Sequence, residues 1–160
     1  MSNVIIGIAD MSVCRDPDTI TTLGLGSCVG IVLYDPTKRI GGMVHVMLPT
    51  ISGVASTENV AKFADSGVLA LMTRMTRSGA QHGQLIAKIA GGAHMFSKTT
   101  SSDIMKVGER NVASCLETLR KLHIPLRGDD TGGTYGRTIE LNTANGMLRV
   151  KTVGHGEKFI

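Results

Sequence analysis

Cys28 is the residue of this sequence best suited to nucleophilic chemistry, and His45 is the residue best placed to assist it. A neutral thiol is a poor nucleophile, because its ordinary pKa of about 8.5 leaves only a few per cent as thiolate at neutral pH. A histidine that holds the thiol proton stabilises the thiolate and later protonates the leaving group. Gly24 and Gly26 allow a tight turn before the cysteine, so N–H groups near Ser27 and Cys28 could face a developing oxyanion. These are the groups needed for acyl transfer through a thioester.

The two residues belong to a predicted hairpin. Segments 29–34 and 40–48 are short and apolar, and Asp35-Pro36-Thr37-Lys38 between them is typical of a turn, since proline presets φ at its second position. If Asp35 faces Lys38, Cys28 faces His45 directly, with Cβ atoms roughly 4.5 to 5.5 Å apart. An odd-length turn or a bulge would slip the register by one residue and send the two side chains to opposite faces.

The residues alone leave other interpretations open. A cysteine at a strand start is most often a small buried hydrophobe, and a histidine on a strand is most often a packed core or surface residue. His94 is a rival base, ranked second, whereas His82, His123 and His155 lie in polar or terminal segments and are expected to be exposed. The other thiols, Cys14 and Cys115, are expected to be structural, and three scattered cysteines fit neither a disulfide framework nor a zinc site.

Length and composition narrow the class of protein. With 160 residues, the chain is expected to form a single domain over residues 1–160. Tryptophan is absent and only 3% of residues are aromatic, which disfavours a single-stranded nucleic-acid binder that needs stacking rings. The net charge of +4 is scattered; it could steer an acidic partner, but a solvated surface is the commoner explanation. The sequence contains no signal peptide and no apolar stretch long enough to span a bilayer, so we expect a cytoplasmic protein with reduced thiols and no membrane insertion.

Hydrophobic periodicity predicts the fold class. Both faces of the hairpin are largely apolar, so its sheet should be covered on both sides, in a single-domain layered α/β sandwich with mostly antiparallel or mixed sheets and two main helices. Segments 10–18 and 97–106 are expected to be loops, and 128–133 a tight turn. Strands are predicted at 4–9, 85–90, 138–142 and 147–153 beside the hairpin, and helices at 59–79 and 109–122.

Two further motifs indicate structure more than a ligand site. Gly91-Gly92 follows a strand but lacks the Gly-x-Gly-x-x-Gly spacing of a phosphate loop, so close approach of two backbones explains it better. Asp129-Asp130 has no supporting His or Glu and is weak as a metal site. We therefore expect no metal and no cofactor.

Several stretches resemble the CheD family, the chemoreceptor glutamine deamidases of bacterial and archaeal chemotaxis. The resemblance covers nearly the whole chain in order. It implies a fold like that of CheD and the cytotoxic necrotizing factor type of cysteine hydrolase, and a catalytic triad of Cys28, His45 and Thr22 in which Thr22 orients the imidazole. The matching stretches are Thr22–Val29, Gly42–Pro49, Ala87–Ala93 with Met95-Phe96, Gly108 with Arg110-Asn111-Val112, and Asp130–Gly133.

The resemblance also implies a function. The expected activity is deamidation of specific chemoreceptor glutamines through a thioester on Cys28, with backbone support from Gly26 and Ser27, and hydrolysis of glutamyl methyl esters by the same cycle. The implied partners are methyl-accepting chemoreceptors, as substrates, and a CheC-type phosphatase. Two alternatives stay open: a non-catalytic module that binds receptors or the phosphatase, and a cysteine peptidase, which uses the same acyl chemistry.

Overall fold

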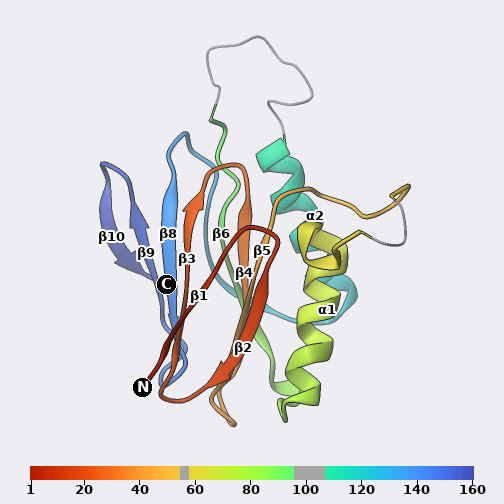
Figure 1. The fold of residues 1–160 in the computed structure, drawn as a ribbon, viewed down its shortest axis with the longest axis vertical. Helices are drawn as coiled ribbons and strands as arrows, with labels where there is room; N and C mark the ends of the chain where they lie inside the picture. The colour runs from red at the N-terminus through yellow and green to blue at the C-terminus, as the bar shows by residue number, and fades with distance from the viewer. Residues whose placement is uncertain (55–57, 96–106) are drawn as a thin grey trace.

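The computed structural model describes residues 1–54, 58–95 and 107–160, which fold into three layers (Figure 1). Helices α1 and α2 cover one face of a central five-stranded sheet, and an outer five-stranded sheet packs against its other face. Both sheets contain parallel and antiparallel pairs. The predicted layered α/β sandwich with two main helices is confirmed for the described part of the chain.

The chain passes between the layers several times. The central sheet has the order β2-β5-β4-β6-β7, formed by β2 Met11–Arg15, β5 Ile40–Val46, β4 Val29–Asp35, β6 Ile86–Gly91 and β7 Leu126–Thr131. The outer sheet has the order β1-β3-β8-β9-β10, formed by β1 Asn3–Ile6, β3 Thr19–Leu25, β8 Arg137–Asn142, β9 Leu148–Thr152 and β10 Gly156–Phe159. The helices are α1 Ala64–Arg77 and α2 Val107–Lys121, with short 3₁₀ turns at Val60–Lys62 and His82–Gln84.

The β4–β5 hairpin supplies the centre of both hydrophobic cores, because its side chains alternate between the two faces. Val29, Ile31 and Val44 pack under the helices, whereas Val32 and Met43 pack against the outer sheet. At Gly30 the two sheets come so close that an added Cβ would lie 2.5 Å from the Ile139 side chain of β8. The prediction that both faces of this sheet are covered is confirmed.

The register of this hairpin differs from the prediction by two residues. Asp35 pairs with Ile40, so His45 faces Gly30 and not Cys28. A shift of two residues leaves every side chain on its predicted face, because side chains alternate with a period of two. Cys28 and His45 therefore lie on the same side of the sheet, in a diagonal relation.

The turn itself explains the shift. The Asp35 side chain accepts hydrogen bonds from the N–H groups of Thr37 and Lys38, at 2.9 and 3.1 Å, and draws both residues into the loop. The Arg39 N–H then donates to the Asp35 carbonyl at 2.8 Å, with Arg39 at a φ of +54°. The loop consequently holds four residues, whereas the prediction allowed two.

Other predicted segments need correction. Residues 11–15, expected within a loop, form edge strand β2, because Met11 and Val13 pack against the core under the helices although the flanking residues are polar. Residues 126–131 form β7, parallel to β6, and the turn predicted at 128–133 begins only at Gly132 and Gly133, both at positive φ. Strand β10 was not predicted, and the loop expected at 97–106 lies outside the described residues.

No described helix combines the length and the apolar character that crossing a membrane requires.

Candidate active site

A hydrogen bond between the two sheets fixes the orientation of His45. Thr22 lies on β3 of the outer sheet, and its Oγ1 donates its single hydrogen to the Ile6 carbonyl of β1 at 2.9 Å. The same oxygen lies 2.7 Å from Nδ1 of His45 on β5, so Nδ1 must carry the proton of that bond. Both side chains are fully buried. Thr22 therefore selects the imidazole tautomer whose Nε2 lone pair is available to accept a proton.

The Nε2 atom of His45 is buried and hydrogen-bonds no described group, the Cys28 thiol included. Cys28 is half-buried and lies between β3 and β4, where the chain crosses from the outer to the central sheet. It packs against the inter-sheet core that includes Met43 of β5, and His45, two residues after Met43 on that strand, points to the same face. The structure thus brings the two residues to one face, as predicted, but the expectation that they stand directly opposite each other is wrong.

Burial sets the resting protonation state of both groups. It lowers the pKa of His45 from 6.5 to about 4, because the charged imidazolium would lose its water between the sheets. Burial also raises the pKa of the Cys28 thiol above 9.0, and a hydrogen bond from the cysteine's own N–H partly opposes that rise. At neutral pH the pair rests as a thiol and a neutral imidazole, not as the thiolate and imidazolium of a charged pair.

The backbone around Cys28 is held by three successive carbonyl groups. The Gly26 carbonyl accepts from Ala93 N–H at 2.8 Å, and the Cys28 carbonyl accepts from Gly92 N–H at 2.8 Å. Between them, the Ser27 carbonyl accepts from the Asn111 side-chain amide at 2.9 Å. In a planar trans peptide the N–H points opposite to the carbonyl of the same unit. The N–H groups of Ser27 and Cys28 therefore point away from these partners, and in the described part of the chain they donate to no other residue.

The glycines before Cys28 contribute in different ways. The pairing of β3 with β8 shifts between Thr22 and Leu25, and Gly24 within this irregularity has a φ of +69°, which favours glycine. Gly26 is not in the left-handed region, and an added Cβ there would contact the flexible Met95 side chain at 3.4 Å. Gly24 therefore lies at an irregularity inside β3 and not in the predicted turn; the chain bends only at residues 26–28, where Gly26 contributes its carbonyl.

The Gly91-Gly92 pair shows the predicted close backbone approach. Gly91 has a φ of +110°, and a Cβ added there would overlap the Cys28 carbonyl oxygen. The segment after β6 can therefore lie directly against the segment that carries the thiol.

Asn111 of α2 is the residue that sequence reasoning missed as an individual contributor. Its side chain is fully buried, and Nδ2 donates to the Ser27 carbonyl and, at 3.1 Å, to the Met47 carbonyl. Both partners are distant in sequence, so periodicity could not have indicated them. The available signals were the family match at Arg110-Asn111-Val112, which assigned Asn111 no role, and the position of a polar residue within a predicted helix.

The remaining candidates lie apart from the Thr22–His45 bond. His94 follows β6. Its backbone N–H donates to the Gly133 carbonyl at 2.8 Å, its ring Nε2 is buried and hydrogen-bonds no described group, and its role stays a prediction. The Asp130 carboxylate contacts Arg137 and Lys158 at 2.9 and 2.7 Å, which also hold its pKa below the ordinary value against the opposing effect of burial. Asp130 thus serves a structural ion pair, and the described residues contain no cluster of His, Cys, Asp or Glu suited to a metal.

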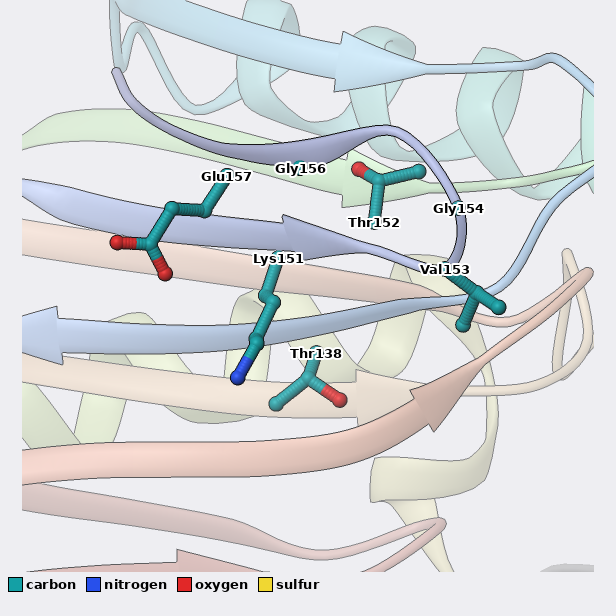
Figure 2. A pocket seen from close by; sticks show the side chains of 7 residues that line it. All are labelled: Thr138, Lys151, Thr152, Val153, Gly154, Gly156 and Glu157. Carbon is teal, nitrogen blue, oxygen red and sulfur yellow. The ribbon is translucent and has the colours of Figure 1, made fainter.

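A surface hollow on the outer sheet is chemically unlike the region around Cys28. It is formed by β8, β9 and β10, and Figure 2 shows the side chains of Lys151 and Thr138 along it. Lys151 is exposed, whereas its strand neighbour Val150 is buried in the inter-sheet core, so the hollow lies on the opposite face of the outer sheet from that core. Its lining holds neither a thiol nor an imidazole.

Comparison with solved structures supports the fold. The chain is similar to the crystal structure of Neisseria meningitidis protein NMB0706, with a TM-score of 0.51 and 7% sequence identity. The similarity covers 81% of this chain and 64% of that one, so this chain spans less than two thirds of that protein. At this identity the likeness extends to the fold alone.

Comparison by sequence identifies the family. The chain is 54% identical over 155 residues to a protein of Lachnoclostridium phytofermentans named probable chemoreceptor glutamine deamidase CheD, covering 97% of this chain and 96% of that protein. It is 46% identical over 162 residues to the chemoreceptor glutamine deamidase CheD of Halalkalibacterium halodurans, covering both chains fully, and 48% identical over 157 residues to that of Bacillus subtilis, covering 97% of this chain and 94% of the other. Residues 47–152 match the family described as CheD chemotactic sensory transduction. The expected resemblance is confirmed, and the chain belongs to the CheD family.

Proposed function

We propose that this protein converts glutamine side chains of chemoreceptors to glutamates, with Cys28 as nucleophile, His45 as general base and acid, and Thr22 as the residue that orients His45. The names of the full-length relatives support the reaction and the substrate. The observation that carries the mechanism is the hydrogen bond from His45 Nδ1 to Thr22 at 2.7 Å, which leaves Nε2 unprotonated on the face that also bears Cys28.

The first half of the cycle forms a thioester. As Sγ of Cys28 attacks the δ-carbonyl carbon of the glutamine, its proton passes to Nε2 of His45, and the carbonyl oxygen becomes an oxyanion. The N–H groups of Ser27 and Cys28, which point away from the partners of their carbonyls, are the donors for that oxyanion. The tetrahedral intermediate then collapses, the C–N bond breaks, and His45 returns the proton so that ammonia leaves.

The second half of the cycle hydrolyses the thioester. His45 Nε2 takes a proton from a water molecule, whose oxygen attacks the same carbon, and the C–S bond breaks to give glutamate and the Cys28 thiol. A glutamyl methyl ester would enter the same cycle, with methanol as the leaving group in place of ammonia. The net reaction in both cases consumes one water and needs no cofactor.

The resting geometry suits attack that is triggered by substrate. The thiol and the imidazole make no hydrogen bond, and both are neutral at rest. Catalytic hydrogen bonds in unoccupied sites are often long and tighten when substrate binds. A half-buried Cys28 meets a protein side chain at the rim, while the base stays buried behind it.

The test is a mass measurement on a purified chemoreceptor fragment treated with wild-type protein, Cys28→Ala or Cys14→Ala. Cys14 is a matched control, because it is also a half-buried free thiol but lies on edge strand β2. Wild-type and Cys14→Ala should both convert glutamine to glutamate and release ammonia, whereas Cys28→Ala should do neither and still bind the receptor. Deamidation by Cys28→Ala would overturn the assignment of the nucleophile.

The same measurement separates the two alternatives. A non-catalytic binding module would bind the receptor without changing its mass, for wild-type and variant alike. A cysteine peptidase would cleave the receptor chain, whereas a deamidase leaves the chain intact and changes only the mass of glutamine-containing peptides.

Two further parts of the proposal rest on the family resemblance. A CheC-type phosphatase as a regulatory partner and action in the cytoplasm, where the Cys28 thiol stays reduced, remain predictions. Adding purified phosphatase to the deamidation assay would show whether the rate changes.

A further inference from the structure

We infer that Asn111 is a positioning residue. Its side chain orients the Cys28 N–H, which is the proposed oxyanion donor, and links the cysteine-bearing segment to the histidine-bearing strand. The inference rests on the proposed deamidase mechanism, which makes the Cys28 N–H a donor to the developing charge. The two hydrogen bonds of Asn111 go to backbone carbonyls near Cys28 and His45 and not to the thiol or the imidazole, so it acts through the backbone.

The first step of the argument is the pair of carbonyls that Asn111 joins. Ser27 immediately precedes Cys28, and Met47 follows His45 by two residues. The Asn111 amide donates to the Ser27 carbonyl at 2.9 Å and to the Met47 carbonyl at 3.1 Å. Both partners are acceptors, so one group can bridge them only if it offers two N–H donors, as a side-chain amide does.

The bridge lies where the sheet stops holding the two segments together. The pairing of β4 and β5 ends at Val29 with Val46. Beyond that pair, the Met47 N–H donates to the Lys62 carbonyl at 2.9 Å, away from the cysteine segment. The Asn111 side chain thus links the two segments beyond the last β4–β5 pair, close to both the nucleophile and the base.

The same bond sets the direction of the Cys28 N–H. The Ser27 carbonyl and the Cys28 N–H belong to one planar peptide unit and point in opposite directions. When Asn111 holds the carbonyl on the α2 side, the N–H is held toward the opposite side, where the thiol lies close enough for this N–H to hydrogen-bond it. Rotation of this peptide plane would turn the donor away from the oxyanion.

The buried Oδ1 of Asn111 distinguishes this role from simple packing. This oxygen is inaccessible to solvent and accepts no hydrogen bond from any described group. An unsatisfied buried acceptor is unfavourable, so this oxygen does not explain why an amide stands here. The two N–H bonds explain why an amide is needed here, and they also fix which amide atom is nitrogen.

The helix that carries Asn111 is seated firmly enough to act as a fixed support. An added Cβ at Gly108 would lie 2.5 Å from the Ala93 carbonyl and 2.6 Å from that of Gly92, so α2 begins in direct contact with the segment after β6. That segment also holds the Gly26 and Cys28 carbonyls. Helix α2 and the segment after β6 thus contact each other and together hydrogen-bond the three consecutive carbonyls of residues 26–28.

The test compares Asn111→Asp and Asn111→Ser with Ser114→Ala. Asp has the shape of Asn but offers two acceptors to two carbonyls, and Ser offers one donor. Ser114 is a matched control, because it lies on the same helix and donates to the Pro49 carbonyl at 2.6 Å without reaching the cysteine segment. Three quantities are measured for each protein: kcat and KM for receptor deamidation, the rate at which iodoacetamide alkylates Cys28 resolved by peptide mass, and the melting temperature.

We expect Asn111→Asp to lower kcat by about 10²-fold, as when one oxyanion donor is lost, with KM little changed. Losing the hydrogen bond from the Cys28 N–H to the thiol should also slow alkylation of Cys28, but by much less than kcat falls, because alkylation needs no oxyanion donor. The kcat of Asn111→Ser should fall between those of Asn111→Asp and wild type, and Ser114→Ala should keep wild-type kcat. If Asn111→Asp does not fold, Asn111→Ser carries the comparison.

Three results would overturn the inference. They are a wild-type kcat in the folded Asn111 variants, an equal loss of kcat in Ser114→Ala, and a loss of kcat that merely parallels a change in alkylation rate and melting temperature. A wild-type protein that does not deamidate receptors at all refutes the proposed function itself, which is a different outcome from an active wild type with active Asn111 variants.

Discussion

Replacing Thr22 with valine tests the orientation of His45 most directly. Valine keeps the branched shape of threonine but removes Oγ1, which both accepts from His45 Nδ1 and donates to the Ile6 carbonyl. The ring then loses the bond that fixes its tautomer and its angle, although no charged group has been altered. The change therefore separates the orienting role from the proton-transfer role.

The expected magnitudes follow from the burial of all three groups. Leaving a buried donor or acceptor without a partner costs about 1 to 3 kcal/mol, and the added methyl group of valine offsets part of that cost. We expect a net loss of about 2 kcal/mol in the free energy of unfolding, or roughly 4 to 8 °C in melting temperature for a chain of this size. The kinetic loss should be larger: kcat should fall by about 10²-fold, at the lower end of what general acid–base catalysis contributes.

Thr21→Val is the matched control. Thr21 is the preceding residue on the same strand, and its hydroxyl lies within hydrogen-bonding distance of two acceptors on the opposite face of the sheet, Asn3 Oδ1 at 3.0 Å and Glu140 Oε2 at 3.2 Å. It should lose some stability and keep its kcat. Thr22→Ser, which retains Oγ1, should recover most of the wild-type rate, and ¹⁵N NMR of the imidazole should show the proton on Nδ1 in wild type but not uniquely so in Thr22→Val. Wild-type kcat in Thr22→Val, or an equal loss in Thr21→Val, would refute the reasoning.

Three other predictions follow from burial around the same site. The pH profile of kcat/KM should fall on the acid side near pH 4, because only the neutral imidazole accepts the thiol proton and burial lowers the pKa of His45 to about 4; an acid limb near pH 6.5 would contradict this. The contribution of neutral His45 to the free energy of unfolding should be fully present above pH 6.5 and fall by about 3 kcal/mol toward pH 4, because unfolded His45 binds a proton that the folded state excludes. Urea titrations should show that His45→Gln lacks this pH-dependent decrease in stability. Gly91→Ala should lower both melting temperature and kcat, because its φ is +110° and its Cβ would overlap the Cys28 carbonyl, whereas Gly83→Ala, with no atom within 4 Å of the new Cβ, should do neither.

Which face of a strand each residue occupies could be predicted from the sequence, but which residue it faces could not. Alternation along β4 and β5 is a local property, so Cys28 and His45 were placed on the correct face. Register depends on the hydrogen bonds of the turn, and the capping of Thr37 and Lys38 by the Asp35 side chain is not visible in hydrophobic periodicity. The helices and the β8–β9 hairpin, with its Asn-Gly turn, were found because their signals are also local.

Elements and contacts that depend on partners distant in the chain could not be predicted from the sequence. Strand β2 is short, is flanked by polar residues and exists because it pairs with β5. Strand β7, with its Gly-Asp-Asp sequence, exists because it pairs with β6. Asn111 makes its contacts 84 and 64 residues away along the chain. Such contacts arise only when the layers are assembled, so no window of sequence contains them.

The bond that fixes the imidazole also crosses the seam between the two sheets, since Thr22 comes from one and His45 from the other. The activity of this protein should therefore depend on the relative position of the two sheets. A small sliding of one over the other, such as a methyl group at Gly30 would impose against Ile139, should silence the enzyme while its unfolding remains cooperative. Folded but inactive variants should accordingly be found along that seam as often as around the sulfur.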